Sequence, residues 1–296
     1  IQAAYCDKVQ KHWSEHLISG LSPEVGRPVN LPLVEMYFEP ALLPARDPRE
    51  RLEEEQKMLT RDALERLNHE MARGRDRLVE ALGQHPRLVL LGKPGSGKTI
   101  TLHYTALMLS QGNPGAARLG LPSSALPILI RLADYAANLK TNPGQTLHQA
   151  LTLGFLELCP HIEHTSLFLE KALEQGGCFI LLDGLDEVGD FGEKLIDGQT
   201  LHQVVLKRIR DFEQLYCRAE SCNRILITSR LEGYAPGSLP GFTEAELSPL
   251  IFPAEVQTFL TYWFTAYRRR NPEISWDEAR AQAAQSVQTD LMPKIA

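Results

Sequence analysis

The chain has 296 residues, of which 43% are hydrophobic, enough for one large domain with additional pieces or for two domains. Its formal net charge of −6 argues against a general nucleic-acid-binding protein, because such proteins are usually basic. No apolar run is long enough to cross a bilayer, and the five cysteines lack the spacing of a disulfide framework. We therefore expect a cytoplasmic protein with reduced thiols and no membrane contact.

The first part of the chain reads as a lead-in to a domain. Residues 1–30 begin with a helix-like stretch around Trp13 and pass into a linker-like segment with Pro and Gly. Residues 31–44 are apolar and interrupted by prolines, and we expect a short strand at 34–38. An Asp-Pro-Arg-Glu sequence opens residues 47–82, with Asp as N-cap, Pro at the first helical position and Glu at the third, and predicts a charged helical segment.

A glycine-rich loop follows, and it carries the most specific motif of the chain. Residues 92–99 match the pattern G-x-x-x-x-G-K-[ST], which is typical of loops that bind nucleotide phosphates. The apolar run at 88–91 predicts a buried strand and residues 100–110 predict a helix, which is the context that the motif requires. The candidate nucleotide-binding residues are Gly92, Pro94, Gly95, Ser96, Gly97, Lys98, Thr99 and Ile100.

The chemistry of such a loop explains its composition. Glycines allow backbone conformations closed to other residues, so several N–H groups can point inward and surround an anion. The first turn of the following helix adds free N–H donors and the positive end of its dipole. We expect Lys98 to reach the β- and γ-phosphates and Thr99 to offer its hydroxyl to Mg²⁺. A plain glycine-rich turn before a core helix is disfavoured by the motif and its context together.

Beyond the loop, apolar segments alternate with amphipathic ones. We expect strands at 126–132, 178–182, 224–228 and 245–247, and helices at 147–158, 167–175, 201–217, 255–270 and 276–289. Continuous apolar strands alternating with helices predict an α/β fold with a parallel sheet covered on both faces. The last two helices indicate the start of a helical domain, in which the Tyr-Trp-Phe sequence at 262–264 is interpreted as core packing rather than a ligand platform.

Two further motifs lie at predicted strand ends. Asp183 directly follows a buried strand and is expected to hold Mg²⁺, directly or through a water. Asp186 and Glu187 come one turn later, and we favour Glu187 as the group that polarises the attacking water, with Asp186 as the alternative or as a second Mg²⁺ contact. Arg230 ends another strand and is expected to contact the γ-phosphate, while Thr228 or Ser229 is a candidate to hold the water. The alternative interpretations are an acidic loop after a core strand for residues 183–187 and a strand-end turn with a surface arginine for residues 228–230.

In this order, the three motifs resemble those of the NACHT family, signal-transducing P-loop NTPases of the STAND class and relatives of the AAA+ proteins. The matching segments are GKPGSGKT at 92–99, FILLDGLDE at 179–187 and RILITSR at 224–230, with softer matches at 127–135 and 247–264. A small residue after the Mg²⁺-binding acid, followed by an acidic pair, separates this family from ordinary AAA+ and helicase patterns. Residues 36–38 resemble the family's lead-in, which lies against the nucleotide base.

The resemblance implies a five-stranded parallel core with the phosphate-loop strand near its middle. It also implies a slow Mg²⁺-dependent ATPase that acts as a nucleotide-controlled switch, in which ADP holds a closed form and ATP accompanies homo-oligomerisation. Family members usually join an N-terminal effector to a C-terminal sensor, which would lie outside this chain, and many bacterial NLR-like members act in defence against phage. No direct nucleic-acid partner is expected.

On this basis we divide the chain into four parts. These are a lead-in at 1–30, a lead-in strand with a charged helical segment at 31–85, a nucleotide-binding core at 86–252 and the beginning of a helical domain at 253–296. Ile1 suggests that the natural chain starts upstream. The chain departs from the family pattern in its long charged segment, in Lys93 where an acid is frequent, and in ending before the family's proline motif and winged helix.

Other functions stay open at this point. A P-loop kinase for a small molecule would need an acceptor site and an arginine-rich lid, and residues 224–250 contain no clear lid. A nucleotide-binding scaffold without hydrolysis is disfavoured by the intact acids at 183, 186 and 187. The Cys-Pro-His-Ile-Glu-His sequence at 159–164 has zinc-ligand residue types but matches no known spacing, so a loop between two helices is the better interpretation.

Overall fold

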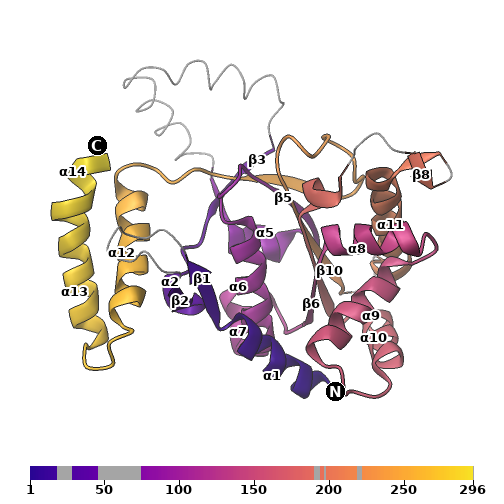
Figure 1. The fold of residues 1–296 in the computed structure, drawn as a ribbon, viewed down its shortest axis with the longest axis horizontal. Helices are drawn as coiled ribbons and strands as arrows, with labels where there is room; N and C mark the ends of the chain where they lie inside the picture. The colour runs from indigo at the N-terminus through magenta and orange to yellow at the C-terminus, as the bar shows by residue number, and fades with distance from the viewer. Residues whose placement is uncertain (19–28, 46–74, 190–193, 197, 219–221, 296) are drawn as a thin grey trace.

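The computed structural model describes residues 1–18, 29–45, 75–189, 194–196, 198–218 and 222–295. Within these residues, seven strands form one sheet with helices on both faces (Figure 1). The order across the sheet is β4 (Asp76–Arg77), β3 (Ala41–Pro44), β11 (Thr243–Leu247), β5 (Arg87–Leu91), β10 (Arg224–Ser229), β7 (Cys178–Asp183) and β6 (Leu126–Arg131). The strands from β11 to β6 run parallel, whereas β3 and β4 pair antiparallel at one edge. The predicted α/β fold is confirmed.

The central strands are buried on both faces, and this explains their continuous apolar sequences. All six residues of β7 are buried, and so are four of the five residues of β5. In a parallel sheet covered by helices on both sides, the side chains on both faces are buried away from water. Burial of each large aliphatic side chain contributes about 1.5–3 kcal/mol. The hydrophobic effect therefore makes these strands visible in the sequence.

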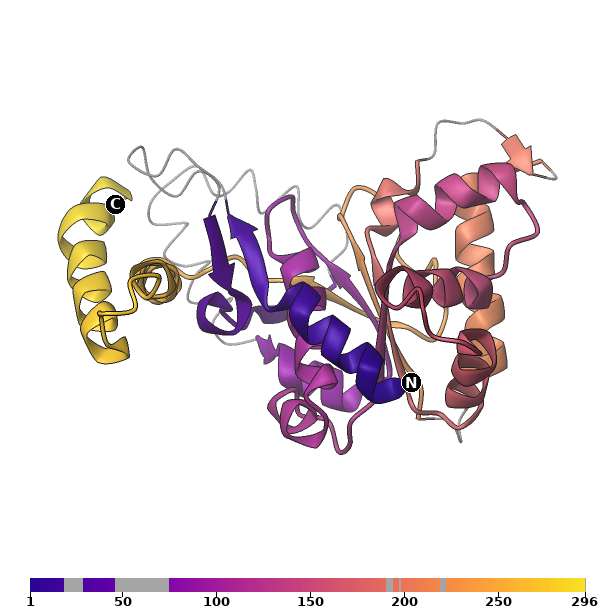
Figure 2. The ribbon, with the colours of Figure 1, turned by 60° about the horizontal axis from the view of Figure 1, so that its bottom comes forward.

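Helices cover the two faces of the sheet (Figures 1 and 2). One face carries α5 (Leu78–Gln84), α6 (Lys98–Ser110) and α7 (Asn113–Arg118), and the other carries α8 (Leu132–Thr141), α9 (Leu147–Leu158), α10 (Thr165–Glu174) and α11 (Leu201–Tyr216). A 3₁₀ turn (Leu185–Val188) follows β7, and a small hairpin, β8 (Lys194–Ile196) with β9 (Gln199–Thr200), precedes α11. The strands and helices predicted between residues 88 and 247 are confirmed, whereas α7 and α8 carry no clear sequence signal.

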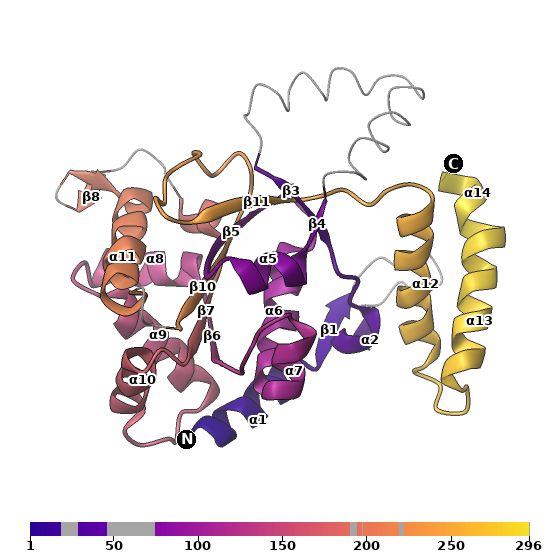
Figure 3. The same cartoon turned by 180° about the vertical axis from the view of Figure 1, so that it is seen from behind.

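A pair of helices stands beside the sheet at the C-terminal end of the chain (Figure 3). These are α12 (Ala254–Arg268) and α13 (Trp276–Ser286), which continues into a π-helical turn (Val287–Leu291) and α14 (Met292–Ile295). The Arg268 guanidinium donates to Gln282 Oε1 and Ser286 Oγ and so joins the two helices. Both predicted helices are confirmed. Among the described helices, none combines the length and hydropathy that a bilayer crossing requires.

The strand predicted at 34–38 is wrong. The chain forms a helical turn there, α2 (Leu33–Met36), between the strands β2 (Val29–Pro32) and β3. The first and last residues of α2 are both 1% exposed, because positions three apart share one side of a helix. In a strand the same two side chains would point to opposite faces. The helical segment predicted at 47–82 lies largely outside the described residues, and β4 and α5 occupy its described end.

The N-terminal helix α1 (Gln2–Trp13) packs into the main core. The Tyr5 ring stacks on the Phe155 ring of α9, with centroids 3.9 Å apart, and Val9 is fully buried. The Gln10 side-chain amide donates to the Ser110 carbonyl oxygen at the end of α6, at 2.8 Å. The helix-like stretch expected around Trp13 is therefore a structural part of the core. The division of the chain into domains stays a prediction.

A second, smaller hydrophobic cluster joins the N-terminal hairpin to α12. The hairpin consists of β1 (Glu15–Ile18) and β2, paired antiparallel. The buried members of the cluster are Val29, Leu31, Met36 and Ala266, with Ile100, Trp263 and Tyr267 packed against them. Figure 3 shows β1 and α2 between the main sheet and α12. Residues 29–36, the start of α6 and α12 are far apart in the sequence and pack against one another here.

The buried histidine of α6 makes stability depend on pH. Burial lowers the pKa of His103 to about 4, whereas in the unfolded chain it titrates near its ordinary value of about 6.5. The stability that neutral His103 contributes is complete above about pH 6.5 and falls by roughly 3 kcal/mol as the pH drops to 4. We predict that His103→Phe loses correspondingly less stability over this range than the wild type, in urea unfolding at several pH values. His161→Phe, at an exposed position, should follow the wild type.

Candidate functional site

The glycine-rich loop connects the end of β5 to the start of α6. Gly95 and Gly97 have φ angles of 74° and 94°, in the left-handed region that glycine adopts without a steric penalty. At Gly92 an added Cβ would lie 2.4 Å from Ser96 Oγ, so a larger residue there would require the Ser96 side chain to move. The strand–loop–helix arrangement expected from the motif is present. The first turn of α6 begins directly after Gly97 and has backbone N–H groups without a partner inside the helix.

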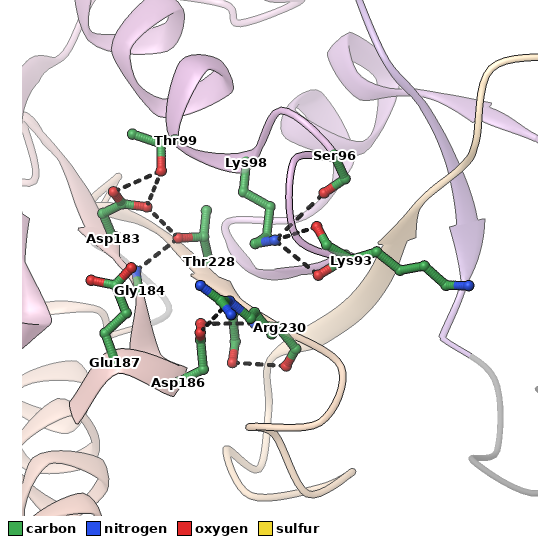
Figure 4. A network of polar contacts seen from close by, with 12 residues as sticks. Lys93, Ser96, Lys98, Thr99, Asp183, Gly184, Asp186, Glu187, Thr228 and Arg230 are labelled. Atoms are coloured by element: carbon green, nitrogen blue, oxygen red, sulfur yellow. Dashed lines mark hydrogen bonds and ion pairs between the residues drawn. The ribbon is translucent and has the colours of Figure 1, made fainter. Parts of the chain in front are cut away.

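The Lys98 ammonium group lies inside this loop (Figure 4). It donates to the carbonyl oxygens of Gly92 at 2.8 Å and Lys93 at 2.9 Å, and it lies 3.5 Å from Ser96 Oγ. Burial lowers the pKa of Lys98, and the Asp186 carboxylate opposes this shift. The side chain of Lys93 points away from this group (Figure 4). One of the two loop lysines therefore supplies the positive charge inside the loop.

Asp183 is the hydrogen-bond acceptor that connects three elements of the core. Thr99 Oγ1 of α6 donates to its two carboxylate oxygens at 3.2 and 3.0 Å. Thr228 Oγ1 of β10 donates to Asp183 Oδ1 at 2.6 Å and accepts the Gly184 N–H at 2.9 Å. Asp183 is only 9% exposed, so these bonds compensate for the burial of its carboxylate. The candidates Thr99 and Asp183 are thus in direct contact, and the Thr228 hydroxyl is already committed to Asp183.

Asp186 holds Arg230 through two contacts. The Arg230 backbone N–H donates to Asp186 Oδ1 at 2.8 Å, and its Nε lies 3.0 Å from Asp186 Oδ2. Gly233 allows this close approach, since an added Cβ there would lie 2.3 Å from Asp186 Cβ. Ser229 is fully buried, and its hydroxyl donates to the Arg230 carbonyl oxygen. The guanidinium expected to meet a γ-phosphate is therefore neutralised by a carboxylate in this structure.

Glu187 pairs with a residue that the sequence analysis does not identify. Its Oε2 lies 3.3 Å from Arg131 Nη2, and both side chains are roughly half exposed. Arg131 ends β6, directly opposite Asp183 in the parallel register. The feature of the sequence that could have identified Arg131 is its position as a charged residue at the end of an apolar segment, in the strand next to the one that ends at Asp183. Because the carboxyl ends of parallel strands lie at one edge of the sheet, the end of this strand could have been predicted to lie near the site.

Most of the side chains described above line one cavity of about 420 Å³, but Arg131 does not. Its lining residues are His16, Leu17, Pro94, Gly95, Ser96, Gly97, Lys98, Thr99, Ile100, Asp183, Gly184, Asp186, Glu187, Thr228, Arg230 and Trp263. Two candidate site residues are not part of this wall: Gly92, whose carbonyl oxygen accepts from Lys98, and the fully buried Ser229. The structure therefore brings the predicted site residues together from the loop, β7 and β10. We call this space the polar cavity.

A second cavity, of about 530 Å³, adjoins the polar cavity along residues 94–97, Ile100 and Trp263. Its wall is rich in rings, among them Tyr37, Phe38, Phe259 and Trp263. Tyr37 is held by stacking on Tyr104 of α6, with ring centroids 3.7 Å apart. We call this space the aromatic cavity. Trp263 is half-buried, packs against the smaller hydrophobic cluster as the core-packing interpretation expects, and also lines both cavities.

The acidic and hydroxyl oxygens of the polar cavity fit a small divalent cation. Asp183 and Thr99 present hard oxygen ligands next to the loop, the donor type that Mg²⁺ prefers. The described residues contain no group of three or more His, Cys, Asp or Glu that could hold a metal ion by themselves. Mg²⁺ commonly completes its coordination with substrate phosphates and water, so a two-residue protein contribution is sufficient for a phosphate-bound ion.

Comparisons with known proteins leave the family open. No protein-family profile matches the chain, and no curated protein matches it. A chain of the E. coli MS115-1 HORMA:CdnC:Trip13 complex is 14% identical, with a TM-score of 0.37, and the match covers 88% of this chain and 83% of that one. The Aeropyrum pernix ORC2 protein (ADPNP-ADP complexes) is 14% identical, with a TM-score of 0.34 and coverages of 83% and 63%, so less than two thirds of its length is matched. Likenesses this distant transfer no function.

The Thr228 hydroxyl is expected to stabilise the fold as well as the site. We predict that Thr228→Val lowers the free energy of unfolding by about 1–3 kcal/mol, because it leaves the Gly184 N–H without an acceptor and removes one donor from Asp183. Thr228→Ser keeps both hydrogen bonds and should stay close to the wild type. Urea unfolding followed by circular dichroism measures the difference, and equal stability of Val and Ser variants would contradict the assigned network.

Proposed function

We propose that the chain binds ATP with Mg²⁺ and hydrolyses it slowly, as the nucleotide-binding module of a NACHT-like switch. One observation carries this proposal: Lys98 within the glycine loop faces the same cavity as Asp183 and the acidic pair of Asp186 and Glu187. A loop for phosphates, an acid for the metal and a carboxylate for the attacking water are the parts that phosphoryl transfer to water requires.

The triphosphate would lie along the loop in the polar cavity. The loop N–H groups and the first turn of α6 supply donors and a positive dipole end for the phosphate oxygens. Lys98 is the mobile part of this group, since its ammonium can exchange the carbonyl acceptors at Gly92 and Lys93 for phosphate oxygens. A phosphate oxygen carries more negative charge than a carbonyl oxygen, so this exchange favours the bound state.

The base would lie in the adjoining aromatic cavity. Flat rings at Tyr37, Phe38, Phe259 and Trp263 provide the apolar surface that suits a nucleobase. Trp263 lines both cavities and so borders the base and the phosphates together. This supports the resemblance of residues 36–38 to a lead-in that lies against the base. The choice of adenine comes from the family resemblance.

Thr99 and Asp183 would hold Mg²⁺, directly or through water. The ion supplies charge neutralisation at the phosphates when it is bound. The residues themselves already lie together, because the Thr99 hydroxyl donates to the Asp183 carboxylate. Metal binding would need the Thr99 hydroxyl to turn its lone pair toward the ion, while the hydrogen bond from Thr228 continues to hold the carboxylate in position.

Both residues proposed to act at the γ-phosphate are paired in the structure. Glu187 must leave Arg131 before it can accept a proton from water, and Arg230 must leave Asp186 before it can reach a phosphate oxygen. The exposed pair of Glu187 with Arg131 is worth about 0–1 kcal/mol, so its opening costs little. Asp186 is only 10% exposed and also accepts the Arg230 backbone N–H, so the release of Arg230 is the more costly of the two steps.

The biological part of the proposal rests on the family resemblance. We propose a cytoplasmic module that forms homo-oligomers when ATP is bound and that works with an N-terminal effector and a C-terminal sensor in defence against phage. A mass measurement with and without ATP tests the assembly. Accumulation of a phosphorylated small molecule would instead favour a kinase, and stable ATP binding without turnover would favour a scaffold.

The loop lysine provides the sharpest test of nucleotide binding. We predict that Lys98→Ala weakens ATP binding by about 10- to 100-fold in calorimetry, because charge-assisted hydrogen bonds are worth about 1.5–3 kcal/mol. Lys140→Ala, on the exposed side of α8, is the matched control and should bind as the wild type does. Unchanged affinity in the Lys98 variant would reject the phosphate-binding loop.

The proposed water-polarising group can be tested separately from binding. We predict that Glu187→Gln lowers the rate of ATP hydrolysis by about 100-fold or more while ATP affinity stays within about twofold, because only proton acceptance is lost. Release of inorganic phosphate measures turnover, and Glu157→Gln on α9 serves as the exposed control. Should turnover persist in Glu187→Gln and fall in Asp186→Asn, the base would be Asp186.

A further inference from the structure

The N-terminal strand β1 reaches the polar cavity. His16 and Leu17 belong to the wall of that cavity, opposite residues from the loop, β7 and β10. Neither residue is part of the phosphate-loop motif, and more than 70 positions separate them from it in the sequence. The loop, the acids and the arginine therefore do not complete the enclosure. A segment from the N-terminal end of the chain contributes to it.

Contacts on both sides hold His16 at this position. Before it, Trp13 stacks on His103 of α6 with ring centroids 5.6 Å apart, and α1 is anchored in the main core. The Ser14 carbonyl oxygen accepts the Leu33 N–H at 2.8 Å. In the hairpin itself, His16 is directly paired with Leu31, which is fully buried against α12. Strand β1 is thus anchored to the main core through α1, and to α12 through its partner strand β2.

His16 lies at the metal-binding end of the nucleotide site rather than at the base. Its ring centroid is 6.1 Å from that of His103, which follows Thr99 by one turn on α6. It lines the cavity that contains Thr99, Asp183 and Glu187, and it is not part of the aromatic cavity. His16 therefore shares a cavity wall with the residues proposed to bind Mg²⁺ and to act at the terminal phosphate, on the side away from the proposed base site.

The imidazole has the right chemistry for a phosphate oxygen. Burial lowers the pKa of His16, so the ring is neutral at physiological pH and carries one N–H donor and one acceptor nitrogen. A neutral donor can bind a phosphate oxygen without the strong attraction that a fixed cation has for every anion. The residue is half-buried in the wall of the polar cavity.

We propose that His16 donates a hydrogen bond to the terminal phosphate of a bound nucleoside triphosphate and thereby helps the site to distinguish the triphosphate from the diphosphate. This proposal rests on the proposed function, since it concerns the same nucleotide. It makes β1 part of the binding site. Because β1 pairs with β2, and β2 packs on α12, the last phosphate is linked through His16 to the C-terminal helices.

The test compares the affinities for a non-hydrolysable ATP analogue and for ADP by calorimetry in the presence of Mg²⁺. We expect His16→Ala to weaken binding of the ATP analogue by about three- to tenfold and binding of ADP by less than about twofold, the effect of one neutral hydrogen bond. His16→Gln retains an N–H donor and should recover part of the loss. His12→Ala, an exposed histidine of the preceding helix that lines a different cavity, should match the wild type for both ligands.

The outcomes separate this proposal from the function on which it rests. If the wild type binds neither nucleotide, the proposed function fails. If Lys98→Ala abolishes binding but His16→Ala leaves the ratio of the two affinities unchanged, or weakens both ligands equally, the role of His16 is overturned and the nucleotide site stands. If His16→Ala proves unstable in thermal unfolding, His16→Phe, which keeps a ring without an N–H donor, decides: a selective loss of affinity for the ATP analogue supports the donor role, and an unchanged ratio or an equal loss for both ligands rejects it.

Discussion

The carboxylate of Asp183 is the contact on which the arrangement of the site depends. Two hydroxyls, from Thr99 on α6 and Thr228 on β10, donate to it, and the Thr228 hydroxyl also accepts the N–H of Gly184. A buried carboxylate is costly unless it is hydrogen-bonded, so the fold must bring these partners to it. These hydrogen bonds hold α6, β7 and β10 in fixed positions relative to one another at the carboxyl edge of the sheet.

The other charged groups of the site are paired with one another. Asp186 binds Arg230 through side chain and backbone, and Glu187 faces Arg131 from the end of the outer parallel strand. The Lys98 ammonium is bound by carbonyl oxygens of its own loop. The pair of Glu187 with Arg131 is roughly half exposed on both sides, whereas Asp186 is largely buried beside Arg230. The charged groups of the candidate site are therefore already in position, and each of them has a partner within the protein.

Much of the fold could be predicted because burial imposes a pattern on the sequence. The apolar runs at β5 and β7, and the helical periods of α9 and α11, were located to within a few residues. The strand predicted at 34–38 is wrong because the prediction rested on the apolar run, whereas the buried residues at 33 and 36 have the spacing of a helical turn. The stacking of Tyr37 on Tyr104 had no local signal, since those rings come from segments 67 positions apart.

The sequence alone determined the parts of the site that lie within continuous motifs. The glycine loop with Lys98 and Thr99, the acids at 183, 186 and 187, and Arg230 follow from residue types whose local geometry is set by the backbone that carries them. The tertiary structure alone decided which distant residues complete the site: Arg131 opposite Asp183, Trp263 between the two cavities and His16 from the N-terminal strand. Their positions depend on strand order, on the hydrophobic cluster around α12 and on the anchoring of α1. These are long-range packing interactions, which produce no recognisable spacing of residues in the sequence.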